Sequence, residues 1–226
     1  MALQDKLDAY TAEFETKIAP PEVVAALRRS TAEIVASGLA TKALAAGARA
    51  PAFSLSDSHG EIVRSDDLLI RGPLVLTFQR GSWCPYCTMD MQAIEAAARQ
   101  IRALGASVVA ISPQSEPNSR KFEADIGLSF SILCDRGNLV AQQFGLRYRV
   151  SQEVLAVYRG LGIDLALGNG EDSLTLPLPA RYVIGRDGII VYAEVNGDYR
   201  RRPDPREWLP VLANLDAHRQ PLQSSP

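Results

Sequence analysis

Histidine and cysteine are both scarce in this chain, whose 226 residues include three cysteines and two histidines. Three cysteines cannot build the disulfide framework of a small secreted protein, and a reducing compartment would keep most of them as thiols. Zinc normally takes four ligands. Outside the Cys84–Cys87 pair the candidates form no second ligand pair, so the sequence argues against a zinc site; they are Cys134, His59 and His218.

An excess of charge and a long apolar run are also missing. The 24 basic and 26 acidic residues leave a formal net charge of -2, so no global field would attract nucleic acid or anionic lipid. The N-terminus carries Asp5, Lys6 and Asp8 before an apolar core could form, and no later stretch has the length of a membrane span. We therefore expect no nucleic-acid partner, no membrane partner and a cytoplasmic location.

The first 44 residues predict an N-terminal helical arm. Apolar residues recur at helical spacing over residues 3–18, and a second such pattern begins near Pro21 and ends near Gly38. The Ala- and Gly-rich stretch that follows is typical of a linker. The apolar faces of the arm must be covered by its own domain or by a second chain, so a homodimer through the arm is one expectation.

Strands and helices alternate over residues 45–218. The runs at 73–78 and 107–113 are apolar and favour strands buried on both faces, with a helical pattern at 87–104 between them. Asp187-Gly188 between apolar runs predicts a closing hairpin. The sequence therefore predicts an α/β fold in which helices flank a central mixed β-sheet that is mostly parallel, with the closing hairpin as its antiparallel edge.

Two segments fall outside this alternation. Residues 150–178 predict an insertion with a short helix followed by a loop, and long inserted loops often shape a site. Residues 219–226 predict a disordered tail.

The stretch GSWCPYC at 81–87 lies where the first buried strand meets a helix. Cys84 at the helix N-terminus would meet unpaired N–H groups and the helix dipole, which favour a thiolate. Cys87 lies in the first turn on the same side, so the two sulfurs can form a disulfide. Trp83 would cover one flank, and Pro85 suits a first turn. We favour redox chemistry here over a purely structural pair.

The runs PLVLTFQRGSWCPYC, LGASVVAISPQS, LSFSILCD and LPLPARYVIGRDGIIVYAEV resemble the alkyl hydroperoxide reductase/thiol-specific antioxidant (AhpC/TSA) branch of the thioredoxin fold. More narrowly, they resemble bacterial peroxiredoxin-like proteins with a Trp-Cys-Pro-Tyr-Cys centre, over roughly residues 45–202. The resemblance implies a thioredoxin-like fold and an antioxidant enzyme that reduces hydrogen peroxide or alkyl hydroperoxides. It also implies an external reductant such as thioredoxin or glutathione, and no bound cofactor or metal.

Two assignments of the cysteines follow from the resemblance. The peroxiredoxin motif Pro-x-x-x-Thr/Ser-x-x-Cys puts Cys87 at the peroxide-attacking position, Cys84 at the Thr/Ser and Arg80 at the Pro. In thioredoxin-like oxidoreductases the first cysteine of Cys-x-x-Cys attacks, which makes Cys84 the nucleophile. Either sulfur would form a sulfenic acid that the other converts to a Cys84–Cys87 disulfide. The order of attack stays open at this point.

Further side chains are candidates beside the cysteines. Arg80 precedes them in a turn, where it either stabilises a thiolate or developing oxyanion or is a solvated loop residue. Pro179 resembles the thioredoxin-fold proline that follows a cis peptide and packs beside the active cysteines. Arg181 lies near the position of an active-site arginine in many peroxiredoxins. Trp83, Pro85 and Tyr86 complete the predicted site.

The remaining candidates favour simpler interpretations. Cys134 is expected to be inert core, and His59 and His218 to be surface residues. The basic run at 198–202 is expected to be a solvated edge, with a border of the site or of a subunit interface as the alternative. Two rival functions use the same cysteine pair. One is a general thiol–disulfide oxidoreductase without peroxidase activity, and the other is a non-enzymatic redox sensor.

Overall fold

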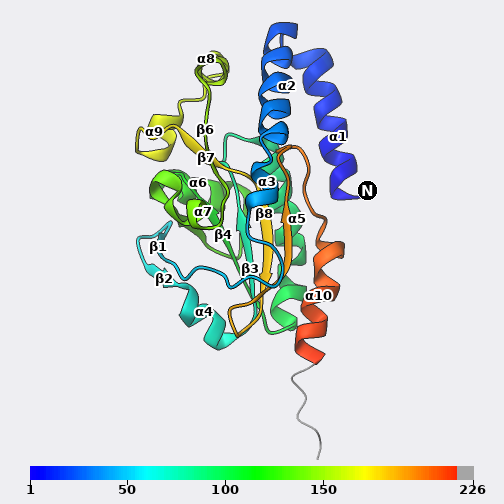
Figure 1. Ribbon diagram of the computed structural model, residues 1–226, viewed down its shortest axis with the longest axis vertical. Helices are drawn as coiled ribbons and strands as arrows, with labels where there is room; N and C mark the ends of the chain where they lie inside the picture. Colours follow the sequence, from blue (N-terminus) through cyan, green and yellow to red (C-terminus); the bar gives the residue numbers. More distant parts are fainter. Residues whose placement is uncertain (218–226) are drawn as a thin grey trace, which may run out of the picture.

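The computed structural model describes residues 1–217, so His218 and the predicted tail at 219–226 lie outside the described residues. A seven-stranded mixed sheet forms the centre, in the order β2-β1-β5-β4-β3-β8-β9 (Figure 1). The predicted central mixed sheet flanked by helices is therefore confirmed. The expectation that it is mostly parallel is wrong, because within residues 1–217 only the pairs β3–β4 and β4–β5 are parallel. The strands of this sheet are β1 (Ser54–Asp57), β2 (Ile62–Arg64), β3 (Leu74–Phe78), β4 (Ser107–Ser112), β5 (Ile132–Cys134), β8 (Ala180–Ile184) and β9 (Ile190–Val195).

Strand β3 lies inside the sheet and leads directly into the cysteine segment. It pairs parallel with β4 and antiparallel with β8, and all five of its residues are buried. Alternate side chains enter different cores, because successive residues of a strand point to opposite faces. Leu74, Leu76 and Phe78 belong to one apolar cluster, and Val75 belongs to the other.

Helices cover both faces of the sheet. The cluster that contains Val75 is completed by residues such as Met91, Phe122 and Trp208, whereas the opposite cluster includes Leu68 and Phe144. The helices that pack in the first cluster are α5 (Pro85–Ala103), α6 (Glu116–Ile126) and α10 (Pro205–Ala217). On the other face lie α4 (Ser65–Arg71), which the sequence analysis missed, and α7 (Leu139–Gln143), which follows the 3₁₀ turn η2 (Arg136–Asn138).

The predicted N-terminal arm is present as two long helical segments and a short one. The first is α1 (Leu3–Glu13) continued by the π-helical turn η1 (Phe14–Ile18), and the others are α2 (Pro21–Ala36) and α3 (Leu39–Lys42). Leu3 and Leu7 are buried in one cluster with the cysteine pair, and the Leu3 amide donates to Asp204 Oδ2 at 3.0 Å. The arm therefore covers much of its apolar face with its own domain. Its division from the domain at residues 44 and 45 stays a prediction.

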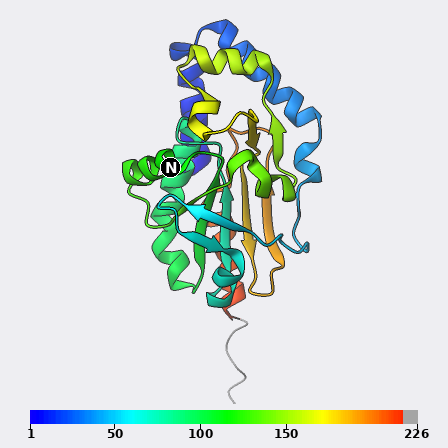
Figure 2. The ribbon, with the colours of Figure 1, turned by 90° about the vertical axis from the view of Figure 1, so that its left-hand side faces the viewer.

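The segment 150–178 stands at the same end of the molecule as the arm. Figure 2 shows α8 (Gln152–Gly160) beside the arm, and α2 contacts α8 through the Arg29–Glu153 ion pair at 2.5 Å. The predicted short helix is confirmed. A second helix, α9 (Leu165–Asn169), and a two-stranded sheet of β6 (Arg147–Arg149) and β7 (Thr175–Pro177) were not predicted.

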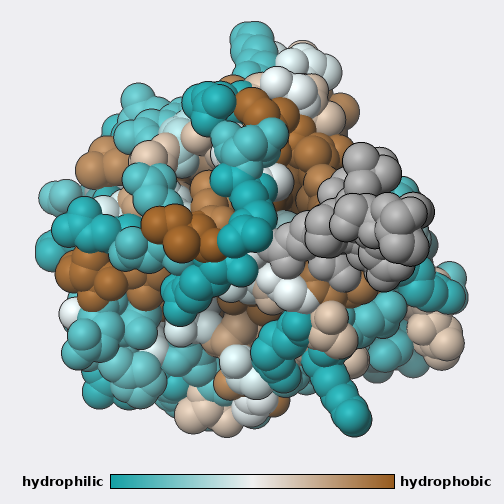
Figure 3. Space-filling view, turned by 90° about the horizontal axis from the view of Figure 1, so that it is seen from below, coloured by the Kyte–Doolittle hydropathy of each residue, from teal (hydrophilic) through white to brown (hydrophobic). Residues whose placement is uncertain are grey.

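The end of the molecule opposite the arm exposes polar residues with scattered apolar ones (Figure 3). Ile70 on α4 is one of the large apolar side chains that are exposed. Within residues 1–217, no helix combines the length and the apolar character that crossing a membrane requires.

Packing of the arm on its own domain predicts a difference between Leu7 and Ile18. Leu7 is 0% exposed and Ile18 is 58% exposed. Leu7→Ala should lower the free energy of unfolding by about 2–5 kcal/mol, because it removes buried methyl groups and leaves a cavity. The control Ile18→Ala should change it by no more than about 0.5 kcal/mol. Urea denaturation measures both, and equal effects would contradict this docking of the arm.

Candidate active site

The cysteine segment connects the end of β3 to the start of α5. Cys84 is the N-cap residue and Pro85 the first residue of α5, and the amides of Cys87 and Thr88 donate to the Cys84 carbonyl oxygen at 2.9 and 3.1 Å. Gly81 allows the turn, because its φ of 144° disfavours other residues and a Cβ there would lie 2.5 Å from the Trp83 indole nitrogen. The first turn of α5 therefore presents both cysteines together, as predicted.

The two cysteines have different access. Both are free thiols and both are buried. Cys84 lines a pocket of about 190 Å³, and Cys87 is not among the described residues that line it. A molecule that enters this pocket meets the sulfur of Cys84 before that of Cys87.

Arg80 is buried beside Cys84, with 2% of its surface exposed. Its Nη1 lies 3.8 Å from Cys84 Sγ, and its Nη2 donates a hydrogen bond to the Tyr158 hydroxyl. Its guanidinium carbon lies 4.2 Å from the ring centroid of Tyr199 and 4.9 Å from that of Trp83. Aromatic faces attract a cation when water is excluded. Arg80 is therefore an enclosed cation beside a sulfur and not a solvated turn residue.

Arg202 approaches the second cysteine. Its Nη2 lies 3.5 Å from Cys87 Sγ, and its Nε lies 3.9 Å from Asp90 Oδ2. The expectation of a solvated edge at 198–202 is wrong for this residue and for Tyr199, because both fold inward over the cysteine segment. The burial of Arg202 leaves no periodic pattern in the sequence, because the residue stands among other charged residues. The neighbouring aromatic residue Tyr199 was the only indication of it.

Arg181 does not reach either cysteine within the described contacts. Its Nη2 donates to Asp90 Oδ1 at 2.8 Å, and its guanidinium carbon lies 5.3 Å from the Trp208 ring. Asp90 thus stands between Arg181 and Arg202. The side chain of Arg181 points to the face of the sheet that α5 and α10 cover. Arg181 therefore contacts the site only through the Asp90 carboxylate.

The groups around the two cysteines shift their pKa values in opposite directions. Burial alone would raise the pKa of Cys84, but the hydrogen bond from Cys87 and the charges of Arg80 and Arg202 lower it to about 5. Burial, that same hydrogen bond and the negative charge of Cys84 raise the pKa of Cys87 well above its ordinary value. At neutral pH the pair therefore holds one thiolate, on Cys84, and one thiol, on Cys87.

Tyr86 and Tyr158 connect the site to neighbouring elements. The Tyr86 hydroxyl shares a hydrogen bond of 2.9 Å with Thr11 on the arm. Tyr158 comes from α8, and burial raises the pKa of its hydroxyl, which stays neutral and accepts from Arg80. Sequence reasoning missed Tyr158, because a single tyrosine on an amphipathic helix looks like ordinary core.

Pro179 differs from its expectation. It directly precedes β8 and is buried. No peptide bond among residues 1–217 is cis. The Leu178 amide before the proline donates to the Leu146 carbonyl at 2.8 Å, which continues the pairing of β6 and β7. The prediction of a cis peptide before Pro179 is wrong.

Cys134 and His59 lie outside the site. Cys134 ends β5, two strands from β3 in the sheet, and contacts Ser119 Oγ at 3.5 Å. Burial raises the pKa of the Cys134 thiol. His59 is exposed in the turn after β1, as predicted. Across the described chain, no three His, Cys, Asp or Glu side chains gather as a metal site would require.

The pocket at Cys84 is walled by both appendages. The arm supplies Tyr10, Phe14 and Leu27, and the segment 150–178 supplies Tyr158, Leu161 and Ile163. The arm and the insertion therefore meet over the cysteine segment. Their side chains exclude water from Arg80 and Cys84.

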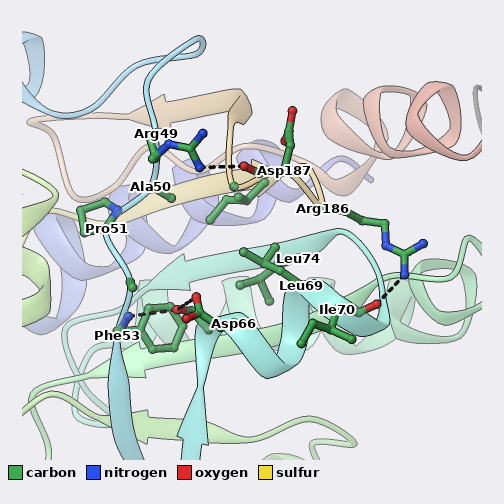
Figure 4. A pocket seen from close by; sticks show the side chains of 14 residues that line it. Arg49, Ala50, Pro51, Phe53, Asp66, Leu69, Ile70, Leu74, Arg186 and Asp187 are labelled. Carbon is green, nitrogen blue, oxygen red and sulfur yellow. Dashed lines mark hydrogen bonds between the residues drawn. The ribbon is translucent and has the colours of Figure 1, made fainter.

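A larger pocket of about 740 Å³ lies between α4 and the β8–β9 turn. Figure 4 shows Arg49 donating to the backbone oxygen of Asp187 and Arg186 donating to that of Ile70 along its rim. Its lining includes neither a cysteine nor a histidine. The reactive thiolate is in the smaller pocket.

Known proteins share sequence and fold with this chain. A family model described as "AhpC/TSA family" matches residues 46–193. Chloroplastic peroxiredoxin Q of Oryza sativa subsp. japonica is 25% identical over 169 residues, which cover 75% of this chain and 67% of that protein. The thiol-disulfide oxidoreductase ResA of Halalkalibacterium halodurans is 32% identical over 103 residues, 45% of this chain and 57% of that protein.

A solved structure shows the fold. The crystal structure of peroxidoxin BcpB from Mycobacterium tuberculosis matches with a TM-score of 0.58 and 24% identity, and covers 78% of this chain and 99% of that chain. The predicted thioredoxin-like fold of the peroxiredoxins is therefore confirmed.

The pKa division predicts selective alkylation of Cys84. The rate of its reaction with iodoacetamide should rise with pH around a midpoint of about 5, because only the thiolate reacts. Peptide mass spectrometry of the same sample gives Cys134 as an internal control, whose pKa burial raises. Arg80→Met should move the Cys84 midpoint upward, because it removes a neighbouring positive charge. A Cys84 midpoint in the range of ordinary thiols would refute the assignment.

The buried carboxylate of Asp90 predicts a large effect on stability. Asp90→Asn should lower the free energy of unfolding by about 3–5 kcal/mol, because it leaves Arg181 and Arg202 buried without their carboxylate. Asp125→Asn is the matched control at an exposed ion pair with Lys121, where a change within about 0.5 kcal/mol is expected. Similar losses in both variants, measured by urea denaturation, would show that Asp90 does not have this role.

Proposed function

The chain belongs to the AhpC/TSA family, and from this premise we propose that it is a thiol-dependent antioxidant oxidoreductase that reduces hydrogen peroxide or alkyl hydroperoxides. The observation that carries the proposal is the asymmetry of the cysteine pair. Cys84 borders the pocket as a thiolate, and Cys87 lies behind it as a protonated thiol. One sulfur is ready to attack an oxygen, and the other is ready to resolve the product.

The proposed reaction proceeds in two steps on the protein. The Cys84 thiolate attacks the distal oxygen of the peroxide, the O–O bond breaks, and Cys84 becomes a sulfenic acid. The departing alkoxide or hydroxide takes a proton from solvent. Cys87 then attacks the Cys84 sulfur, a Cys84–Cys87 disulfide forms, and water leaves. An external dithiol, or two thiols, returns both cysteines to the reduced state by disulfide exchange.

Arg80 has two tasks in this proposal. Its charge stabilises the Cys84 thiolate before the reaction, and its donors stabilise the charge that develops on the departing oxygen. Arg202 polarises the region around Cys87, and Asp90 and Arg181 hold Arg202 in position. Trp83, Pro85 and Tyr86 shape the turn and the wall of the pocket.

The choice of Cys84 as the attacking sulfur departs from the family motif. By register, Cys87 stands at the peroxide-attacking position, while Arg80 and Cys84 replace the Pro and Thr that shape the peroxide pocket. With those residues replaced, the positive charge and the pocket both favour Cys84. Attack by Cys87 is the alternative that the experiment below distinguishes.

Further properties belong to the proposal. The reductant is thioredoxin or glutathione, no cofactor is bound, and the location is cytoplasmic. A homodimer would use the apolar residues of the arm that its own domain leaves exposed, such as Ile18 and Val35.

A general thiol–disulfide oxidoreductase is the second candidate function. It is supported by the low pKa of the first cysteine of a Cys-x-x-Cys at a helix N-terminus, which is the arrangement that disulfide exchange requires. The similarity to ResA over 103 residues points in the same direction.

Peroxide consumption with a thiol reductant tests the main proposal. Wild type should turn over hydrogen peroxide, and Cys84→Ser should lose this activity because the attacking thiolate is gone. Cys87→Ser should react once and hold a sulfenic acid on Cys84, detected as a dimedone adduct by mass spectrometry. Cys134→Ser is the control and should match wild type.

The other outcomes assign the alternatives. A dimedone adduct on Cys87 in Cys84→Ser would make Cys87 the attacking sulfur. Reduction of insulin disulfides without peroxide turnover would favour the second candidate. If the protein has neither activity, the non-enzymatic redox sensor would be the remaining function.

A further inference from the structure

The pocket above Cys84 has an unusual lining for a site that need only admit hydrogen peroxide. Six aromatic side chains border it, and Arg80 is its one cationic residue among those described. The aromatic side chains are Tyr10, Phe14, Trp83, Tyr86, Tyr158 and Tyr199. A lining of this kind favours a ligand with a large apolar part, because ring edges and faces pack well against another ring.

The volume of the pocket sets the size of that ligand. It measures about 190 Å³. An apolar protein cavity of about 150 Å³ is large enough to bind benzene, whereas one water molecule takes about 30 Å³ of liquid. Hydrogen peroxide, which is not much larger than water, would leave most of this pocket without a solute. A single aromatic ring with a short substituent would fill it.

Two polar residues of the lining lie close together. Cys84 and Arg80 both line the pocket, and Arg80 Nη1 lies 3.8 Å from Cys84 Sγ. Arg80 Nε is buried and has no hydrogen-bond partner within residues 1–217. A buried donor without a partner is costly, and an oxygen of a bound ligand would relieve this cost. The ligand therefore carries its oxygen atoms at one end and is apolar elsewhere.

Part of this lining lies outside the residues that the family model matches. Tyr10, Phe14 and Leu27 belong to the arm, whereas the family match begins at residue 46. The arm closes one side of the pocket over Cys84.

We propose that the pocket binds an aryl-substituted organic hydroperoxide, with its ring against the arm and α8 and its peroxide group at Cys84 and Arg80. This inference rests on the proposed function for the reaction and adds the class of substrate. Cys84 takes the distal oxygen as a sulfenic acid, the O–O bond breaks, and the organic part leaves as the corresponding alcohol after it gains a proton. Phe14 and Leu27 act as specificity-determining residues, because they contact the ring and not the reacting atoms.

Steady-state kinetics with two peroxides test the substrate class. Wild type should have a higher kcat/KM for cumene hydroperoxide than for hydrogen peroxide. Leu27→Trp, which fills the pocket with an indole, should lower kcat/KM for cumene hydroperoxide at least about tenfold, the scale of steric discrimination in an apolar pocket. It should lower kcat/KM for hydrogen peroxide by a smaller factor, so that the ratio of the two values falls. Leu167→Trp is the matched control, because Leu167 is 79% exposed and is not among the residues that line the pocket.

A binding measurement separates this inference from the proposed function. Cumyl alcohol, the product of cumene hydroperoxide, should bind Cys84→Ser in isothermal titration calorimetry, and Leu27→Trp added to that variant should abolish binding. Such binding, together with a wild-type protein that turns over no peroxide, would support the pocket and refute the function. Peroxide turnover without alcohol binding and without preference for cumene hydroperoxide would overturn the inference and leave the function standing. Insulin reduction blocked by Leu27→Trp, without alcohol binding, would also overturn it, because the pocket would then serve a protein substrate.

Discussion

Arg80 carries its charge with almost no access to water, and the arrangement of the site follows from this burial. A buried guanidinium costs free energy unless anions, hydrogen-bond acceptors and polarisable faces replace its hydration. Here Tyr158 accepts one hydrogen bond, Tyr199 and Trp83 present ring faces, and the Cys84 sulfur is the nearby group that can bear a negative charge. The thiolate and the arginine are therefore stable inside the protein only together.

Burial and the same electrostatics raise the pKa of the second cysteine, Cys87, instead of lowering it. Three guanidinium groups are buried around the cysteine pair, those of Arg80, Arg181 and Arg202, and the Asp90 carboxylate pairs with two of them, Arg181 and Arg202. The excess of positive charge favours one thiolate, and the thiol of Cys87 stabilises it by donating a hydrogen bond. A second negative charge so close would be repelled. One proton shared between two sulfurs is thus a property of the whole charged cluster and not of the Cys-x-x-Cys spacing alone.

The sequence predicted those parts of the molecule whose signals are local. The apolar run of β3, the amphipathic pattern of α5 and the Asp-Gly hairpin each carry a local signal within a few positions. The strands β6 and β7 have three residues each and were missed, since three residues establish no period. Cys84, Cys87, Arg80 and Trp83 were identified because they are contiguous. Arg202, Tyr199 and Tyr158 were not, because only the tertiary fold brings them to the cysteines.

The arm, the insertion and the segment after β9 contribute to the site from positions as distant as Tyr10 and Arg202. Closing the long loops between such residues costs entropy before any contact repays it. Arg80 is near Cys84 in the sequence, but its burial and the approach of Arg202 require the folded chain. The low pKa of the Cys84 thiol is thus acquired with the tertiary fold, and loss of that fold would return Cys84 to an ordinary thiol.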